Sequence, residues 1–265
     1  MKQDGYRKIT IKPHGRAALI SFARQEVRNA FDLEMLVELR DALANLRREK
    51  NYRVIILTGE GTCFCAGADI SWMKKSMDLS LEENLREAEE LAHCLYELYS
   101  HPLPTIAMVN GPAMGGGIGF VAACDIAVSV EDAFFAFSEV RIGVVPSCIA
   151  PYVLKKVGEG VTRQLFLTGE KISTSRAHEI GLVNCIVTGD ELDEVVTEYV
   201  ERIEKGAPGA VTASKKLIES VTGSSLEVAK EYTARLIAEM RVSPEGQEGL
   251  RAYLEKRKPS WQSDE

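Results

Sequence analysis

The sequence predicts an α/β fold that is followed by a helical region at the C-terminal end. Short apolar runs rich in β-branched residues alternate with amphipathic helical patterns up to about residue 190, which is typical of α/β chains. Beyond that point the patterns are helical and highly charged. We therefore divide the chain into an α/β core over residues 1–190 and a helical region over residues 191–265.

The apolar runs and the helical patterns can be placed in order along the chain. Six runs are predicted to be strands: residues 17–22, 54–57, 105–109, 126–128, 134–137 and 182–187. Residues 32–46 are predicted to be a helix, because Asp32 is a favourable N-cap and leucines follow at helical spacing. A second helix over residues 81–99 ends before the breaker SHPLP. The first helix of the C-terminal region presents one apolar face and stops at Gly206 and Pro208.

Composition excludes several classes of function. The chain of 265 residues is 45% hydrophobic and carries a net charge of −7, which argues against a general nucleic-acid or anionic-membrane surface. No apolar run approaches the roughly 20 residues that span a bilayer. The first residues lack the features of a secretory or transit peptide, and six scattered cysteines are expected to be reduced. These features predict a cytoplasmic protein, and the four histidines form no pattern typical of a metal site.

Two glycine-rich loops stand out as candidates for chemistry. EGTCFCAGADI covers residues 60–70, NGPAMGGGIGFVAACD covers residues 110–125, and each follows a predicted strand where a helix is about to begin. Main-chain N–H groups at a helix start are unpaired and lie at the positive end of the dipole. Two such loops side by side would direct two donors at one oxygen, as in an oxyanion hole.

Two other interpretations of the glycines remain open. Glycine-rich loops also occur where helices pack closely on strands. In addition, Gly117, Gly119 and Ala122 match the dinucleotide-binding pattern G-x-G-x-x-A, and Glu139 lies about 20 residues further on. Residues 110–114 nevertheless separate the strand from these glycines, whereas the fingerprint places its first glycine in the tight turn itself. The dinucleotide interpretation is therefore the weaker one.

A series of motifs resembles a known family over essentially the whole chain. The motifs are RNAF, CAGADI, NGPAMGGG followed by CDIAV, FSEVRIGVVP, LTGEKISTSRAHEIGLVNCIV and LEKRK. In this order they resemble the crotonase superfamily, the enoyl-CoA hydratase/isomerase family. The resemblance implies a spiral of ββα units with a C-terminal helical region that forms a homotrimer or a dimer of trimers. It also implies an acyl-CoA thioester substrate, so that coenzyme A enters with the substrate and no separate cofactor is expected.

The resemblance assigns an oxyanion hole to two main-chain amides. By motif, the N–H groups of Ala68 and Gly116 would hold the thioester oxygen, with Gly115 lining the same place. The bare backbone at residues 115–117 is then expected to leave room for that oxygen. Negative charge grows on the oxygen in the transition state, so the donors would favour the transition state over the substrate. Losing one such donor typically costs about 3 kcal/mol.

Glu139 is the predicted acid–base group, because FSEV matches one of two glutamates with which hydratases of this family activate water. Its apolar neighbours in residues 134–140 are expected to raise its pKa towards working pH. The second glutamate should lie three residues after Gly116, where this sequence has Gly119. Three possibilities stay open: Glu139 acts alone on water, it shuttles a proton between carbons, or Ser147 or a substrate carboxylate helps to position water.

Contacts with coenzyme A are also implied by the resemblance. Ala66 and Ile70 would lie around the adenine. Basic residues that could meet the phosphates are Arg24 and Arg28 on an early loop and, across a subunit boundary, Lys256, Arg257 and Lys258.

The leading hypothesis is a hydratase or lyase that adds water to, or removes it from, an α,β-unsaturated CoA thioester. The segments GGGIGF and SEVRIGVVPSCIAPYV most resemble bacterial methylglutaconyl-CoA hydratases. This resemblance suggests methylglutaconyl-CoA as the substrate and Arg141 as a partner for its carboxylate. An enoyl-CoA double-bond isomerase and a non-catalytic acyl-CoA-binding member are the alternatives.

Overall fold

A six-stranded sheet lies at the centre of the part of the chain that the computed structural model describes, residues 5–262. Residues 1–4 and 263–265, the outer ends of the two predicted regions, lie outside it. Across the sheet, the strands are β1 (Ile9–His14), β2 (Ala17–Phe22), β3 (Val54–Gly59), β4 (Thr105–Val109), β6 (Ile126–Val130) and β9 (Cys185–Val187). Only β1 and β2 run antiparallel, and every other neighbouring pair is parallel.

A smaller, three-stranded sheet connects the second glycine-rich loop to the segment before Glu139. Its strands are β5 (Ala113–Met114), β7 (Phe134–Ala136) and β8 (Lys171–Ser173). Met114 at the end of β5 pairs with Ala136 at the end of β7. The pairing therefore brings Glu139, three residues after β7, to the end of the glycine-rich loop.

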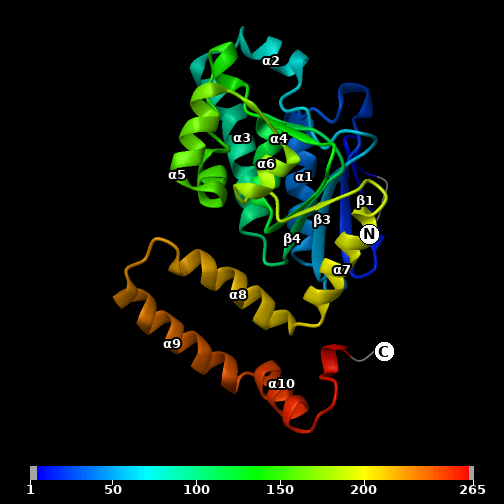
Figure 1. The fold of residues 1–265 in the computed structure, drawn as a ribbon, viewed down its shortest axis with the longest axis vertical. Helices are drawn as coiled ribbons and strands as arrows, with labels where there is room; N and C mark the ends of the chain where they lie inside the picture. Colours follow the sequence, from blue (N-terminus) through cyan, green and yellow to red (C-terminus); the bar gives the residue numbers. More distant parts are fainter. Residues whose placement is uncertain (1–4, 263–265) are drawn as a thin grey trace.

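Helices cover the sheets and form the C-terminal region (Figure 1). In chain order they are α1 (Leu33–Leu46), α2 (Ile70–Ser76), α3 (Leu81–Tyr99), α4 (Gly116–Ala123), α5 (Ala150–Thr168), α6 (Thr174–Glu179), α7 (Leu192–Glu204), α8 (Pro208–Val221), α9 (Leu226–Val242) and α10 (Pro244–Leu254). Short 3-10 helices are η1 (Gln25–Val27), η2 (Glu139–Ile142) and η3 (Ser260–Gln262).

The two faces of the large sheet pack on different helices, because successive side chains of a strand point to opposite faces. Ile55 and Leu57 of β3 join a core that includes buried residues of α1, α3 and α4. Val54 and Ile56 face the other way and pack with Val196 of α7. Helix α7 therefore covers the second face of the sheet, although the sequence places it in the helical region that begins at residue 191.

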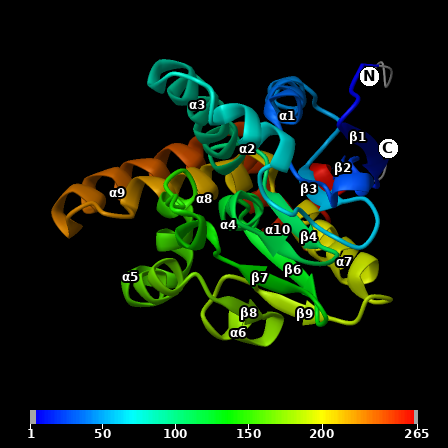
Figure 2. The same ribbon diagram turned by 90° about the horizontal axis from the view of Figure 1, so that it is seen from above.

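Helices α8, α9 and α10 form a separate layer below the core (Figure 1), and α9 extends past the core when seen from above (Figure 2). Two side chains of α8 attach this layer to the core. Thr212 Oγ1 donates to Pro102 O (3.1 Å), and Lys215 Nζ pairs with Asp125 Oδ2 at 2.7 Å. Large apolar side chains of the layer are exposed, namely those of Ile218, Leu226, Val228, Ile237, Val242, Leu250, Tyr253 and Leu254.

All six predicted strands form, but the strand over residues 134–137 ends at Ala136 and the last strand starts later than predicted. Leu182 and Val183 were predicted to begin the last strand, but both donate main-chain hydrogen bonds to Ala177 O and so close the turn after α6. Asp32 caps α1 as predicted, since its side chain accepts from the N–H of Met35 (2.9 Å). No helix within residues 5–262 combines the length and the apolar character that crossing a bilayer requires.

Candidate active site

The first glycine-rich loop is held by hydrogen bonds on either side of Ala68. Phe31 N–H donates to Gly67 O and Asp69 N–H donates to Phe31 O, both at 2.8 Å. These two bonds form a parallel bridge between Phe31 and Ala68. In such a bridge the flanking peptide groups make the bonds, so the N–H of Ala68 itself points away from the Phe31 segment.

The second glycine-rich loop lies directly beside the first. Met114 N–H donates to Cys65 O at 2.9 Å, and Cys65 forms a parallel bridge with Ala113. Gly67 has φ +90°, and a Cβ on it would lie 2.9 Å from Met114 O. Only glycine permits this approach, so the loops stand side by side as an oxyanion hole requires.

Two main-chain donors remain available where the loops meet. Ala68 and Gly116 are partly exposed, whereas Gly67 and Gly117 beside them are buried. Within residues 5–262, the N–H groups of Ala68 and Gly116 donate to no other residue. Gly116 is the first residue of α4, where an amide has no acceptor in its own helix. The pair can therefore bind an oxygen that carries negative charge.

The glycines of the second loop are needed for packing against the protein itself. A Cβ on Gly116 would lie 2.6 Å from Cζ of Phe31, and one on Gly117 would lie 2.6 Å from Cys65 O. The prediction that a ligand oxygen demands bare backbone at these two positions is therefore wrong. Phe31 and the first loop occupy the space instead, so Gly116 packs against the residue that forms the bridge with Ala68.

Glu139 lies against the same loop. Its Oε1 is 3.3 Å from the position that a Cβ would take on Gly115, which has φ +50°. Oε2 is buried and has no hydrogen-bond partner among the described residues. Burial raises the pKa of Glu139, in the predicted direction, against the opposing effect of a main-chain hydrogen bond at the same residue. Because buried polar atoms are normally paired, an unpaired carboxylate oxygen with a raised pKa next to the second loop is a candidate for proton transfer.

Position 119, where a second acid is absent from the sequence, has no room for one. Gly119 is buried in α4, and a Cβ there would overlap Cγ2 of Ile149 and lie 3.3 Å from Cδ1 of Leu95. Ile149 is itself only 2% exposed. A second carboxyl group at position 119 would therefore have to displace Ile149, which makes an apolar contact there.

The dinucleotide interpretation fails on the same contacts. Gly117 and Gly119 are buried inside α4 and packed against Cys65 and Ile149, so neither offers open backbone to a pyrophosphate. Glu139 opens a 3-10 helix rather than ending a second strand of the large sheet.

Three of the predicted substrate-binding residues lie with the first loop. Ala66 is half-buried, and its N–H donates to Arg28 O at 3.0 Å. Ile70 begins α2 and is 83% exposed. The Arg28 side chain is exposed on the adjoining segment, at a residue in the left-handed conformation (φ 55°). These three residues therefore surround the outer side of the loop that carries Ala68.

Ser147 lies two residues before Ile149, which contacts Gly119, whereas the three predicted basic residues at the C-terminal end lie elsewhere. Ser147 is exposed, and no hydrogen bond within residues 5–262 joins it to Glu139. Lys256 and Lys258 are exposed after α10, at the opposite end of the molecule from α2 (Figure 1). Arg257 pairs with Glu248 at 2.7 Å.

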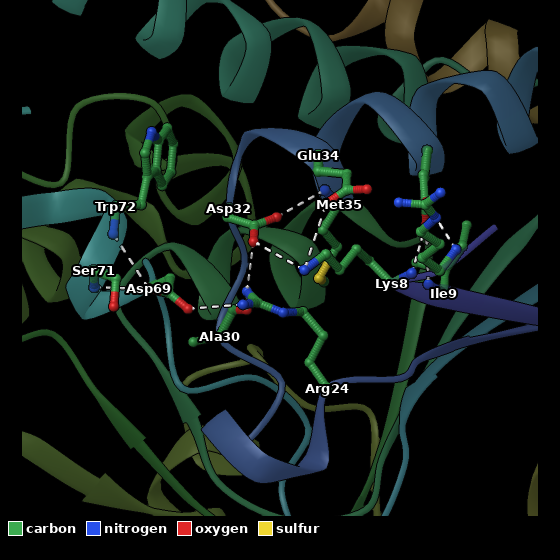
Figure 3. Close-up of polar contacts among 12 residues, drawn as sticks. Lys8, Ile9, Arg24, Ala30, Asp32, Glu34, Met35, Asp69, Ser71 and Trp72 are labelled. Atoms are coloured by element: carbon green, nitrogen blue, oxygen red, sulfur yellow. Dashed lines mark hydrogen bonds and ion pairs between the residues drawn. The ribbon is translucent and has the colours of Figure 1, made fainter. Parts of the chain in front are cut away.

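The structure contradicts the role predicted for Arg24. It was predicted to meet phosphates from an early loop, but it is 8% exposed and its guanidinium is bound to Asp69 (2.9 Å) and Asp32 (3.1 Å), as Figure 3 shows. A side chain so enclosed is part of the scaffold.

Two residues that shape the site were not singled out from the sequence. Phe31 stands in the RNAF motif, which marks the place but not the contact of its ring with Gly116. Ile149 carries no local signal, since its contact with Gly119 joins residues that are far apart in the chain.

Comparison with known proteins agrees with this arrangement. Residues 14–264 match the family model described as enoyl-CoA hydratase/isomerase. A Thermus thermophilus protein described as a candidate enoyl-CoA hydratase is 35% identical over 245 residues, covering 92% of this chain and 97% of that protein.

Solved structures extend the likeness to three dimensions. An enoyl-CoA hydratase from Shewanella pealeana superimposes with a TM-score of 0.94 at 34% identity, covering 98% of this chain and 97% of that one. A Legionella pneumophila protein described as a candidate enoyl-CoA hydratase/isomerase (crotonase) gives a TM-score of 0.91 at 41% identity, with coverage of 96% and 99%. The predicted spiral fold is thereby confirmed, and the chain belongs to the enoyl-CoA hydratase/isomerase family of the crotonase superfamily.

Proposed function

We propose that this chain is an enoyl-CoA hydratase, a hydro-lyase that adds water to an α,β-unsaturated CoA thioester and removes it in reverse. Glu139 is the proton-transfer residue, and the N–H groups of Ala68 and Gly116 hold the thioester oxygen. The observation that carries the proposal is the half-buried carboxyl of Glu139, with its Oε2 unpaired, against a loop that carries one of two unpaired amides on adjacent loops.

These groups supply each step of the hydration. The ionised Glu139 takes a proton from water while the water oxygen attacks the β-carbon of the acyl chain. The electron pair of the double bond moves towards the thioester, and the charge that develops on its oxygen is stabilised by the two N–H groups. Protonated Glu139 then gives its proton to the α-carbon, so the carboxylate is regenerated. One carboxyl thus serves as both base and acid, which agrees with the lack of space at Gly119.

A double-bond isomerase is the second candidate, and the single carboxyl is the observation that favours it. Moving a proton from the γ-carbon to the α-carbon, or the reverse, requires one base and an oxyanion hole but no bound water. A non-catalytic acyl-CoA-binding protein is less well supported. Such a protein would gain nothing from leaving the buried Oε2 of Glu139 without a partner.

Methylglutaconyl-CoA is the substrate that we propose to test first, on the strength of sequence resemblance alone. Arg141 does not support it, because this exposed side chain runs past Gly169, with its Cγ 3.2 Å from the position of a Cβ there. Crotonyl-CoA, whose acyl chain carries no free carboxylate, is the comparison substrate. A preference for crotonyl-CoA would contradict this choice of substrate and leave the hydratase assignment in place.

The reaction is tested by following the absorbance of the conjugated thioester. Hydration removes this absorbance from crotonyl-CoA and methylglutaconyl-CoA, whereas isomerisation of 3-hexenoyl-CoA creates it. We expect hydration that falls at least 100-fold in Glu139→Gln with thioester binding retained. Full activity in that variant would contradict the role of Glu139, and turnover of 3-hexenoyl-CoA without hydration would establish the isomerase instead.

We also propose that α8, α9 and α10 assemble the chain into a homotrimer or a dimer of trimers. The support is the row of large apolar side chains that these helices expose, such as Leu226, Tyr253 and Leu254. Light scattering should give a trimer or hexamer mass, and Tyr253→Asp should lower it. A monomeric wild-type chain would contradict the proposal. The cytoplasmic location stays a prediction from the sequence.

A further inference from the structure

Arg24 binds three oxygens on the two segments that flank the Phe31–Ala68 bridge. Nη1 donates to Ala30 O (2.5 Å) and lies 3.1 Å from Asp32 Oδ2, while Nη2 donates to Asp69 Oδ2 at 2.9 Å. Figure 3 shows the guanidinium between Asp32 and Asp69. Arg24 therefore joins the residues immediately before and after Phe31 to the residue immediately after Ala68.

Both aspartates are themselves fixed by the helices that they cap. Asp69 Oδ1 accepts from the N–H groups of Ser71 (2.7 Å) and Trp72 at the start of α2, and Asp32 caps α1. Burial alone would raise the pKa of Asp69, but these hydrogen bonds and the Arg24 guanidinium hold it below its usual value. The carboxylate stays ionised, and the backbone at Asp69 is held from three directions.

Phe31 transmits this constraint to both donors. Its main chain makes the two hydrogen bonds that flank Ala68 and so sets the direction of the Ala68 N–H. Its ring lies against Gly116, 2.6 Å from the position of a Cβ, and contacts the ring of Phe120 in α4 edge-on. A shift of residues 30–32 would therefore change the separation and the direction of the two N–H groups together.

We infer that Arg24 is a positioning residue for the oxyanion hole, which fixes the Ala68 and Gly116 amides through Asp69, Asp32 and Phe31 without touching the substrate. This inference rests on the proposed function. Small errors of placement matter in such a site, because a misplacement of about 1 Å can cost on the order of 100-fold in rate. Neither lysine nor methionine can replace the guanidinium fork, which reaches three acceptors in one plane.

The matched variants are Arg24→Met, Arg24→Lys and Arg40→Met. Arg40 pairs with Glu90 at 2.6 Å and Glu97 at 2.7 Å, so it also binds two carboxylates, but it connects α1 to α3. Arg24→Lys keeps the positive charge between the aspartates and serves if Arg24→Met does not fold. All variants are compared at a temperature where circular dichroism shows them to be folded.

The direct readout is the infrared carbonyl stretch of bound butanoyl-CoA that carries ¹³C in its thioester carbonyl. This saturated ester has no double bond to hydrate, so the measurement does not depend on turnover. We expect a shift to lower frequency on binding to wild type and to Arg40→Met, a smaller shift in Arg24→Lys, and little shift in Arg24→Met. With crotonyl-CoA, kcat should fall on the order of 100-fold in Arg24→Met while KM changes only a few-fold.

The outcomes separate the inference from the function on which it rests. A wild-type carbonyl shift that persists in folded Arg24→Met and Arg24→Lys would overturn the positioning role. So would an equal loss in Arg40→Met, because the effect would then be one of general stability. No shift in wild type would instead overturn the oxyanion hole and with it the proposed function.

Discussion

Replacing Gly116 by alanine tests how the oxyanion hole is built. The added Cβ would lie 2.6 Å from Cζ and 2.7 Å from Cε1 of Phe31, inside van der Waals contact with a ring that is 1% exposed. Phe31 cannot move freely, because its main chain is hydrogen-bonded to the residues on both sides of Ala68. The strain must therefore displace Gly116, the residue whose N–H is one of the two donors.

The magnitudes follow from two separate effects. Overpacking against a buried side chain such as the Phe31 ring costs about 1–3 kcal/mol of folding stability. Losing one oxyanion donor costs about 3 kcal/mol of transition-state stabilisation, which corresponds to a rate loss of somewhat more than 100-fold. We expect Gly116→Ala to lower kcat by about that factor and to change KM little, as measured with crotonyl-CoA.

Two further variants control this experiment. Gly160→Ala in α5 adds a Cβ where nothing lies within 4 Å, so activity should not change and stability should rise by up to about 1 kcal/mol. Gly116→Ala combined with Phe31→Leu removes the clashing ring atoms, and the combined loss of stability should be smaller than the sum of the single losses. A Gly116→Ala protein with wild-type kcat would refute the reasoning.

Other predictions concern the single acid, the packing at position 119 and a buried histidine. Hydration needs ionised Glu139, and burial raises the pKa of this group. We therefore expect kcat/KM to fall as the pH drops through a pKa above that of an ordinary glutamate. A pH profile of kcat/KM whose acid limb lies at the ordinary value would contradict this. In Gly119→Ala the added Cβ overlaps Ile149, and the free energy of unfolding in urea should fall by about 1–3 kcal/mol. In the double variant Gly119→Ala with Ile149→Ala, the loss should be smaller than the sum of the two single losses. Additive losses would contradict the contact. His101 is buried, accepts from Leu103 N–H and bonds to Leu43 O, and burial lowers its pKa to about 4. As the pH falls, the histidine of the unfolded chain is protonated before that of the folded chain. Wild type should therefore lose up to about 3 kcal/mol of folding stability between pH 6.5 and 4, and His101→Gln should not show this loss. The same pH dependence of stability in both proteins would contradict this.

Five of the six strands of the large sheet and the cap of α1 could be predicted because each depends on a few neighbouring residues, whereas the edge strand β1 was missed. Asp32 is a cap by virtue of its own side chain and the amide of Met35, three residues away. Strand β5 could not be predicted, since its two residues pair with a strand about 20 positions later and with Cys65, far earlier in the chain. The tertiary position of α7 on the sheet was equally beyond a local pattern.

The candidate site was predicted in outline and misread in two physical details. Glycine density correctly indicated that something approaches residues 116 and 117, but the sequence could not show that Phe31 and Cys65 are the groups that do so. In the same way, the charge of Arg24 suggested a phosphate contact, whereas its burial between two aspartates makes it part of the scaffold. Both errors came from contacts between segments that are distant in the chain.

The central claim is that the main-chain amides of Ala68 and Gly116 bind one thioester oxygen beside Glu139. A crystal structure with bound butanoyl-CoA tests it most directly. We predict both amide nitrogens within about 2.7–3.1 Å of the thioester oxygen and the Glu139 carboxyl next to the α- and β-carbons. A thioester oxygen bound away from these two amides, or an acyl chain that does not reach Glu139, would contradict the account.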